Sequence, residues 1–428
     1  MYANEYSQRA LNGLIRADEA TLHPALSKEH NRIDYVRRIA DKVRDYSFQF
    51  HAMKRIKVGE FHAYSPIKLG DTLVIRRLNN ALRRAYRIKQ SDRTDVVRQT
   101  IRLLAEPVPK YVIKLDIKSF YESVDRRALL HKLSHDRLLS PRSRGLLSNF
   151  FDSIGDQVPV GLPRGISLSA TLSEIFMHTL DKRVRQIDGI YFAARYVDDL
   201  IIFSTIHPSS VIPKVEDLLP TGMRLNKGKC KSVFVGCRCT TGCIHTGICP
   251  CIKKCSCTPD PAHRRILDYL GYRLSFNDVP AGAEKKNGMT VTVGMSSTKV
   301  KRYKTRVVLA LRSHIASPDF QLLRERIRFL CENTEMRGPL LRGKLKTGIR
   351  FNYPLINDIS ELVELDDFLR SQLGAVRGKY GASVAASMSS SQKRALAEFS
   401  FRSGHQSCRS RRIHATVFSK IKACWQHA

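Results

Sequence analysis

The sequence is poor in acidic residues and has no long apolar run. It holds 39 Asp and Glu against 73 Lys and Arg in 428 residues, a formal net charge of +34. An excess of this size, spread along the chain, favours a polyanion as the partner, and nucleic acid first of all. No stretch approaches the roughly 18 apolar residues of a membrane span, and the first twenty residues lack the apolar core of a secretory signal. We therefore expect no membrane partner and a cytoplasmic location.

Glycine and proline are also scarce, at 24 and 17 residues, whereas 43% of the residues are hydrophobic. This composition excludes global disorder and a fibrous protein, and it predicts a folded chain long enough for more than one domain. Eleven cysteines in a reducing compartment do not predict disulfides. Their crowding in one part of the chain indicates a metal site instead.

Seven of the cysteines fall within 21 residues, in a C-x-C-x3-C pattern that repeats after twelve residues and closes with a further x-C. Two tetrahedral Zn²⁺ ions need eight ligand positions, which seven thiolates supply if a histidine joins them or if one thiolate bridges both ions. We therefore expect two structural zinc ions, with an iron–sulfur cluster and scattered thiols as the alternatives. The expected ligands are Cys237, Cys239, Cys243, His245, Cys249, Cys251, Cys255 and Cys257.

Three aspartates follow or join β-prone runs. Residues 110–115 predict a strand that ends at Asp116, and the runs 189–195 and 200–204 predict a hairpin with Asp198 and Asp199 at its tip. Phosphoryl transfer to a 3′-hydroxyl uses two Mg²⁺ ions, which prefer hard oxygen ligands. If the strands are neighbours, these carboxylates supply such a site. The alternative is that they are ordinary turn residues, in which Asp is common.

The remaining patterns predict secondary structure only. Residues 64–77 predict two strands joined at Gly70-Asp71, and the Gly- and Pro-rich loop 161–165 leads into a helix. Residues after 297, from 320 to 331 and from 358 to 369 predict further helices, and residues 383–391 predict a small-residue linker.

Five short segments occur in the order of palm motifs A to E of reverse transcriptases, which the sequence resembles over about residues 55–310. They are Asp116-Ile-Lys-Ser-Phe-Tyr, Gly161-Leu-Pro-Arg-Gly, Tyr196-Val-Asp-Asp, Leu225-Asn-Lys-Gly-Lys and Tyr269-Leu-Gly-Tyr. Within that class the chain is most similar to bacterial retron, group II intron and defence-associated enzymes. Residues 120–124 and 162–170 resemble the antiviral defence-associated type most, with the second subunit of the class-three systems as the finer placement.

The resemblance implies an α+β, right-hand polymerase fold of fingers, palm and thumb, with a zinc insert in the palm and a helical C-terminal extension. The expected parts are an N-terminal helical extension (1–54), fingers (55–110), a palm with motifs A to D (111–236), the Cys-rich insert (237–257), the end of the palm with motif E (258–290), a thumb (291–350), and a helical, basic C-terminal region (351–428).

The resemblance also implies a set of site residues. Asp116 and Asp198 become the main Mg²⁺ ligands, Asp199 a supporting carboxylate, and the carbonyl oxygen of Ile117 a further ligand. Lys229 would protonate or hold the departing pyrophosphate. Expected contacts to the deoxynucleotide come from Ile117, Tyr121, Lys68, Arg76, Arg77, Arg164 and Gly165, and the expected primer grip is Tyr269, Leu270, Gly271 and Tyr272.

Two of these residues carry particular expectations. Tyr121 would exclude a ribose 2′-hydroxyl by steric clash and so select DNA synthesis, with an ordinary core aromatic as the alternative. Arg164 stands where many relatives carry Gln, which alters the expected contact to template or nucleotide.

The implied activity is that of an RNA-directed DNA polymerase, a nucleotidyltransferase with two Mg²⁺ ions, in bacterial antiphage defence. Its implied partners are an RNA template, a DNA product and dNTPs, with a noncoding RNA and a second reverse transcriptase subunit as further candidates. The alternatives are a retron-type enzyme that copies a dedicated noncoding RNA, and a non-catalytic, maturase-like scaffold that binds nucleic acid.

Overall fold

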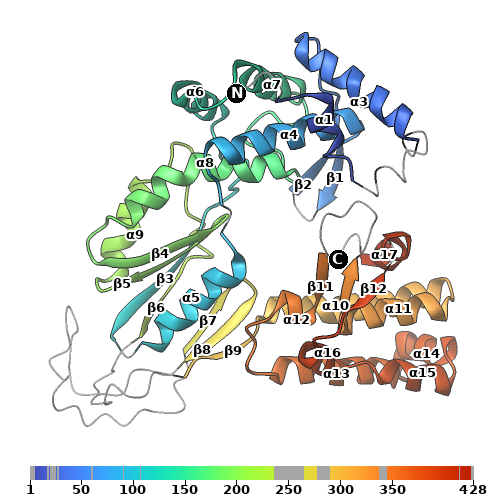
Figure 1. The fold of residues 1–428 in the computed structure, drawn as a ribbon. Helices are drawn as coiled ribbons and strands as arrows, with labels where there is room; N and C mark the ends of the chain where they lie inside the picture. Colours follow the sequence, from blue (N-terminus) through green and yellow to red (C-terminus); the bar gives the residue numbers. More distant parts are fainter. Residues whose placement is uncertain are drawn as a thin grey trace, which may run out of the picture. The chain divides into compact units, whose positions relative to one another are not determined.

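The computed structural model describes residues 5–16, 19, 26, 28–58, 61–89, 91–106, 108–235, 265–276, 290–336, 345–413 and 415–425. They belong to two compact units, one of residues 1–96 and 108–255 and the other of residues 97–107 and 256–428 (Figure 1). The mixture of helices and strands confirms the α+β class. The predicted Cys-rich insert, with all eight expected zinc ligands, lies outside the described residues.

The first unit contains a four-stranded antiparallel sheet in the order β4-β5-β3-β6. Its strands are β3 (Lys110–Asp116), β4 (Ile190–Tyr196), β5 (Asp199–Ser204) and β6 (Lys231–Val235). The two central strands, β3 and β5, are buried along most of their length, and their apolar residues fill both faces of the sheet. Helix α8 (Ser167–Val184) packs against edge strand β4, and α9 (Pro208–Asp217) follows β5 (Figure 1). The predicted strand, hairpin and helix are thus confirmed.

In the described part of this unit, the other elements are helices and one hairpin. They are α1 (Gln8–Asn12), α3 (Glu29–Arg44), β1 (Met53–Val58), β2 (Phe61–Pro66), α4 (Leu69–Ala85), α6 (Arg126–Asp136) and α7 (Pro141–Ser153). Helix α4 packs against α7 and α8 (Figure 1). The chain therefore runs from the β1–β2 hairpin into α4, which packs on α8, the helix that contacts β4.

The hairpin predicted at residues 64–77 is wrong. The strand that pairs with β2 is β1, on its N-terminal side, and Gly70-Asp71 lies in the first turn of α4. Leu69, Leu73 and Leu82 belong to a buried face with helical spacing, which outweighs the turn propensity of the Gly-Asp pair. Gly70 also lets this turn pack closely, because a Cβ there would lie 3.2 Å from the side chain of Ile39.

The second unit begins with most of α5 (Arg93–Ala105) and continues after the undescribed segment with a three-stranded sheet. That sheet consists of β7 (Arg265–Tyr269), β8 (Tyr272–Phe276) and β9 (Thr292–Met295). The predicted helices are present as α10 (Ser297–Ala316), α11 (Phe320–Cys331) and α13 (Ser360–Leu373). None of the helices in the described ranges is long and apolar enough to cross a membrane.

The C-terminal part of this unit is richer in structure than the sequence predicted. A second small sheet has the order β11-β10-β12, from β10 (Asn333–Met336), β11 (Leu345–Gly348) and β12 (Arg411–Ile413). The remaining elements are α12 (Ile349–Asn352), α14 (Gly378–Ser387), α15 (Ser390–Ala397), α16 (Phe401–Gln406), α17 (Ala415–Lys422) and η3 (Ala423–Trp425). The linker predicted at 383–391 is wrong, because Ser389 and Gln392 form a capping box that starts α15 directly after α14.

Candidate active site

Three aspartates meet at one end of the sheet in the first unit. Strands β3 and β5 pair with Asp116 opposite Asp199. The backbone N–H of Ile117 donates to the carbonyl oxygen of Asp198 at 3.1 Å, and the carbonyl oxygen of Asp116 accepts from the N–H of Asn226 at 2.7 Å. Strand pairing therefore brings together carboxylates that are more than eighty residues apart in the chain, as the sequence interpretation required.

A strained turn carries Asp198. Only Val197 and Asp198 separate β4 from β5, and Val197 has a φ of 60°. A β-branched residue in the left-handed region is a genuine outlier, and such strain persists only where the surrounding structure fixes it.

Burial and the charges of neighbouring aspartates raise the pKa values of Asp198 and Asp199. Burial is the largest cause that raises the pKa of Asp198, and the charge of Asp116 raises it further. Burial, opposed by Lys114 and reinforced by the other two aspartates, raises the pKa of Asp199 to about 6. Two lysines partly offset the negative charge, with Lys114 Nζ 3.7 Å from Asp199 Oδ1 and Lys229 Nζ 3.5 Å from Asp116 Oδ1.

The carboxylates fit a hard divalent cation. The buried Oδ1 of Asp199 has no hydrogen-bond partner. Among the residues that the structure describes, the three aspartates have only two lysines within 4 Å, Lys114 and Lys229, so part of their negative charge is not compensated by these lysines. Carboxylate oxygens are the ligands that Mg²⁺ prefers. Within the described ranges no group of three or more His, Cys, Asp and Glu stands ready to hold a metal ion, and the binding of Mg²⁺ by these carboxylates stays a prediction.

The glycine loop fixes Tyr121 and the β1–β2 hairpin. Gly161 has a φ of 69°, and a Cβ there would lie 2.3 Å from the carbonyl oxygen of Tyr121, which also accepts the N–H of Leu162 at 2.7 Å. Gly165 has a φ of 97°, and its Cβ would lie 2.8 Å from the carbonyl oxygen of Tyr64. Both glycines therefore allow a close approach to protein backbone, and the expected contact of Gly165 with the deoxynucleotide stays a prediction.

Arg164 is held by protein groups on both sides. Its guanidinium forms two hydrogen bonds to Glu122, at 2.5 and 2.8 Å, which raise the pKa of Arg164. It also lies 4.1 Å from the ring centroid of Phe61 and 5.5 Å from that of Tyr121. Sequence reasoning missed Glu122 and Phe61, although an acid beside the expected nucleotide residue Tyr121 was a visible signal. A contact from Arg164 to template or nucleotide stays a prediction.

Two of the three cations expected on the fingers are engaged elsewhere. Arg76 pairs with Glu19, with Nη2 2.5 Å from Oε1, and Arg77 donates to the carbonyl oxygen of Glu5. Both residues thus anchor the N-terminal segment to α4. Lys68, directly before α4, is the exposed member of the three.

The expected primer grip lies in the second unit, at the tip of the β7–β8 hairpin. Leu270 and Gly271 form its two-residue turn, with φ of 46° and 82°, as a type I′ turn requires. The side chains of Tyr269 and Tyr272 are buried in the core of that unit. The turn itself is half-buried and is the more accessible part of this motif, and the role of the motif as a primer grip stays a prediction.

Residues 68–274 match the family described as reverse transcriptase (RNA-dependent DNA polymerase). This match covers just under half of the chain, and it spans the three aspartates, the glycine loop and Lys229. Members of the matched family are described as RNA-dependent DNA polymerases, which is the activity that the sequence resemblance implies.

Among solved structures, the chain is similar to telomerases of two yeasts. A C-terminally truncated apo telomerase from Candida tropicalis is 15% identical over 62% of this chain and 60% of its own, with a TM-score of 0.35. The telomerase from Candida albicans with a TWJ fragment of telomeric RNA is 14% identical over 80% and 64%, with a TM-score of 0.34. The corresponding Candida tropicalis complex is 13% identical over 92% and 65%, with a TM-score of 0.35. The chain thus spans less than two thirds of these telomerase chains, and no curated protein matches it.

Proposed function

We propose that the chain copies RNA into DNA by adding deoxynucleotides to a 3′-hydroxyl, with Asp116, Asp198 and Asp199 as the carboxylates that hold two Mg²⁺ ions. The observation that carries the proposal is the pairing of Asp116 with Asp199 inside the region that matches the reverse transcriptase family. When bound, the ions supply activation of the attacking hydroxyl and neutralisation of the leaving pyrophosphate.

The surrounding residues take defined roles in this proposal. Asp116 and Asp198 are the principal ligands, and Asp199 and the carbonyl oxygen of Ile117 complete the set. Lys229 is 65% exposed and 3.5 Å from Asp116, so its flexible ammonium group can reach a departing pyrophosphate at the same end of the sheet. Tyr121, with its backbone fixed by the glycine loop, offers the ring that excludes a 2′-hydroxyl. Lys68 is the exposed cation available to the triphosphate.

In the terms of a right-hand polymerase, we assign β1, β2 and α4 to the fingers and the four-stranded sheet with α8 to the palm. Helices α10 and α11 correspond to the thumb in this assignment. Basic residues are numerous along α10, among them Lys299, Lys301 and Arg302, which suits contact with the phosphates of a product duplex.

The test is incorporation of labelled dNTPs on a primed RNA template. The wild-type protein should extend the primer in Mg²⁺, and Asp198→Asn should abolish extension. Asp188→Asn, an exposed aspartate before β4, is the matched control and should retain activity. Binding of RNA without extension by the wild-type protein would instead identify a non-catalytic scaffold, and equal extension by Asp198→Asn would remove the assigned carboxylates from the reaction.

We further infer a role in bacterial antiphage defence, supported by the resemblance of residues 120–124 and 162–170 to defence-associated enzymes. Phage plating on bacteria that express the protein with a noncoding RNA or a second subunit should fall for the wild type and recover with Asp198→Asn. Sequencing of the DNA made in these cells distinguishes the alternatives, because a retron-type enzyme yields one defined short product.

Two zinc ions bound by Cys237, Cys239, Cys243, His245, Cys249, Cys251, Cys255 and Cys257 remain part of the proposal. Metal analysis of the purified protein should find zinc, and serine substitution of the cysteines should remove it. Iron in place of zinc would favour a cluster.

A further inference from the structure

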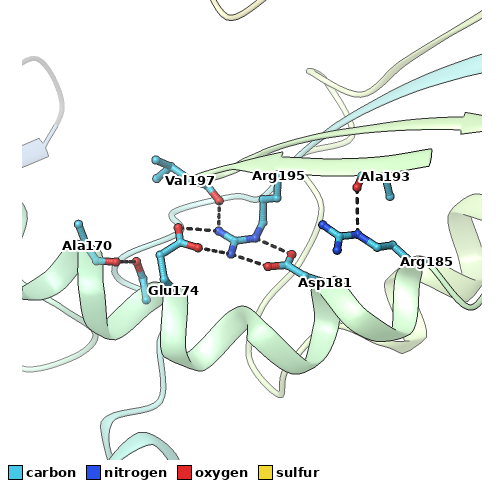
Figure 2. Close-up of polar contacts among 8 residues, drawn as sticks. Ala170, Glu174, Asp181, Arg185, Ala193, Arg195 and Val197 are labelled. Atoms are coloured by element: carbon cyan, nitrogen blue, oxygen red, sulfur yellow. Dashed lines mark hydrogen bonds and ion pairs between the residues drawn. The ribbon is translucent and has the colours of Figure 1, made fainter. Parts of the chain in front are cut away.

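Arg195, the last residue but one of β4, is enclosed by protein acceptors, and its side chain is 2% exposed. Nε donates to Asp181 at 2.8 Å, and Nη2 donates to Asp181 at 2.8 Å and to Glu174 at 2.7 Å (Figure 2). Nη1 donates to Glu174 at 3.1 Å and to the carbonyl oxygen of Val197 at 2.9 Å. An arginine has five N–H donors, so every donor of Arg195 is used inside the fold.

Both acids project from α8 towards β4 (Figure 2). Burial alone would lower the pKa of Arg195, but the hydrogen bonds and charges of Asp181 and Glu174 outweigh it and raise that pKa. A buried ion pair is weak evidence of a gain in stability over an apolar contact. The two carboxylates fix the orientation of the guanidinium. The remaining N–H of Nη1 then points at the turn of Val197 and Asp198, between β4 and β5.

The residue that receives this hydrogen bond is the strained one. Val197 is left-handed at φ 60°, and its carbonyl oxygen belongs to the peptide that precedes Asp198. The peptide that follows Asp198 is held from the other side, because its carbonyl oxygen accepts from Ile117 N–H at 3.1 Å. Hydrogen bonds therefore fix both peptide bonds of Asp198, one from Arg195 and the other from Ile117, which directly follows β3.

We propose that Arg195, aligned by Glu174 and Asp181, is a positioning residue that keeps Val197 left-handed and thereby orients Asp198 for metal binding. The inference rests on the proposed role of Asp198. It does not require Arg195 to touch substrate, because the guanidinium has no free donor.

The central variant is Arg195→Lys, which keeps the charge but replaces a planar fork of five donors by one ammonium group. It is combined with Val197→Gly, because glycine adopts a left-handed φ without support. Arg185→Lys is the matched control. Arg185 also links the end of α8 to β4, through Nε and the carbonyl oxygen of Ala193 at 3.2 Å, but it contacts the strand and not the turn (Figure 2).

Three quantities are measured: kcat and the KM for dNTP in primer extension, and the affinity for Mn²⁺ by electron paramagnetic resonance. Arg195→Lys should lower kcat about tenfold or more and weaken Mn²⁺ binding by a similar factor, with KM for dNTP within about twofold. In the Val197→Gly background the same substitution should change kcat less than about threefold. Arg185→Lys should leave kcat and Mn²⁺ affinity unchanged.

Equal effects of Arg195→Lys in both backgrounds would overturn the proposal, as would a lower melting temperature with unchanged kcat and Mn²⁺ affinity. If Arg195→Lys does not fold, Glu174→Gln provides the test, because Asp181 still neutralises the guanidinium; it should produce a smaller loss in the same direction. If the wild type fails to extend any primer while its Mn²⁺ affinity still depends on Arg195, the polymerase proposal fails and the positioning role stands.

Discussion

Removing one charge from the aspartate cluster should stabilise the metal-free protein while it abolishes activity. In Asp199→Asn the uncharged amide replaces a carboxylate whose pKa is raised from 3.8 to about 6 by burial and by the neighbouring aspartates. A carboxyl group with a raised pKa in the folded state opposes folding at neutral pH, because ionisation is easier in the unfolded chain. The native cluster is therefore held together against its own repulsion.

The size of the effect follows from this shift. About two pKa units at roughly 1.4 kcal/mol each give about 3 kcal/mol of destabilisation at pH 7 as an upper estimate. Loss of the contact between Lys114 and Asp199, at 3.7 Å, offsets part of the gain. We expect the free energy of unfolding to rise by about 1–3 kcal/mol, which corresponds to about 2–4 °C in melting temperature for each kcal/mol in a domain of this size.

The assay is thermal unfolding in chelator and in Mg²⁺, from pH 4 to 8. In chelator the variant should melt above the wild type at pH 7, and the difference should shrink through about pH 6 and vanish near the ordinary carboxyl pKa of 3.8. Mg²⁺ should stabilise the wild type more than the variant, because it binds the folded carboxylates. Asp188→Asn should change neither curve. A variant that melts below the wild type in chelator at pH 7 would refute the electrostatic reasoning.

Three further predictions concern single side chains. Tyr121→Ala should lower the preference for dNTP over rNTP by tenfold or more, about 1.4 kcal/mol or above, in single-nucleotide incorporation, and an unchanged ratio would place the ring in the core alone. Lys229→Met should lower kcat about tenfold with little change in stability, because the lysine is 65% exposed; Lys227→Met is the control, and equal losses in both would argue for a general charge effect. Gly161→Ala should cost about 2–4 kcal/mol of stability, because its Cβ would lie 2.3 Å from the carbonyl oxygen of Tyr121 at a φ of 69°. Gly145→Ala, where a Cβ meets nothing within 4 Å, should not destabilise α7 in the same denaturation experiment.

Local patterns predicted the elements whose periodicity agrees with their packing. β-Prone runs identified β3 and β5, and residues after 297 and from 320 to 331 were predicted as the helices that are α10 and α11. The prediction failed where a turn-forming pair sits inside a helix, at Gly70-Asp71. There the buried leucine face of α4 decides the structure, and this face is visible only over a window longer than the assumed hairpin.

The sequence predicted the carboxylates of the candidate site, but it did not predict the side chains that position them. Asp116 and Asp199 stand at a strand end and a strand start, so strand pairing alone brings them together. The partners of Arg195 could not be read in advance, because Glu174 and Asp181 are separated from it by 21 and 14 residues and meet it only through the packing of α8 on β4. Long-range ion pairs depend on tertiary geometry, which single-sequence spacing does not contain.

The chain passes between the two units at three places, because residues 97–107 belong with the segment that starts at residue 256. Thr100 and Leu104 of α5 are completely buried. A fragment cut at residue 255 would carry these side chains without the unit to which they belong, and it would expose apolar surface that invites aggregation. During synthesis about 150 further residues follow this helix before the segment that completes its unit begins, so the helix leaves the ribosome long before its packing partners.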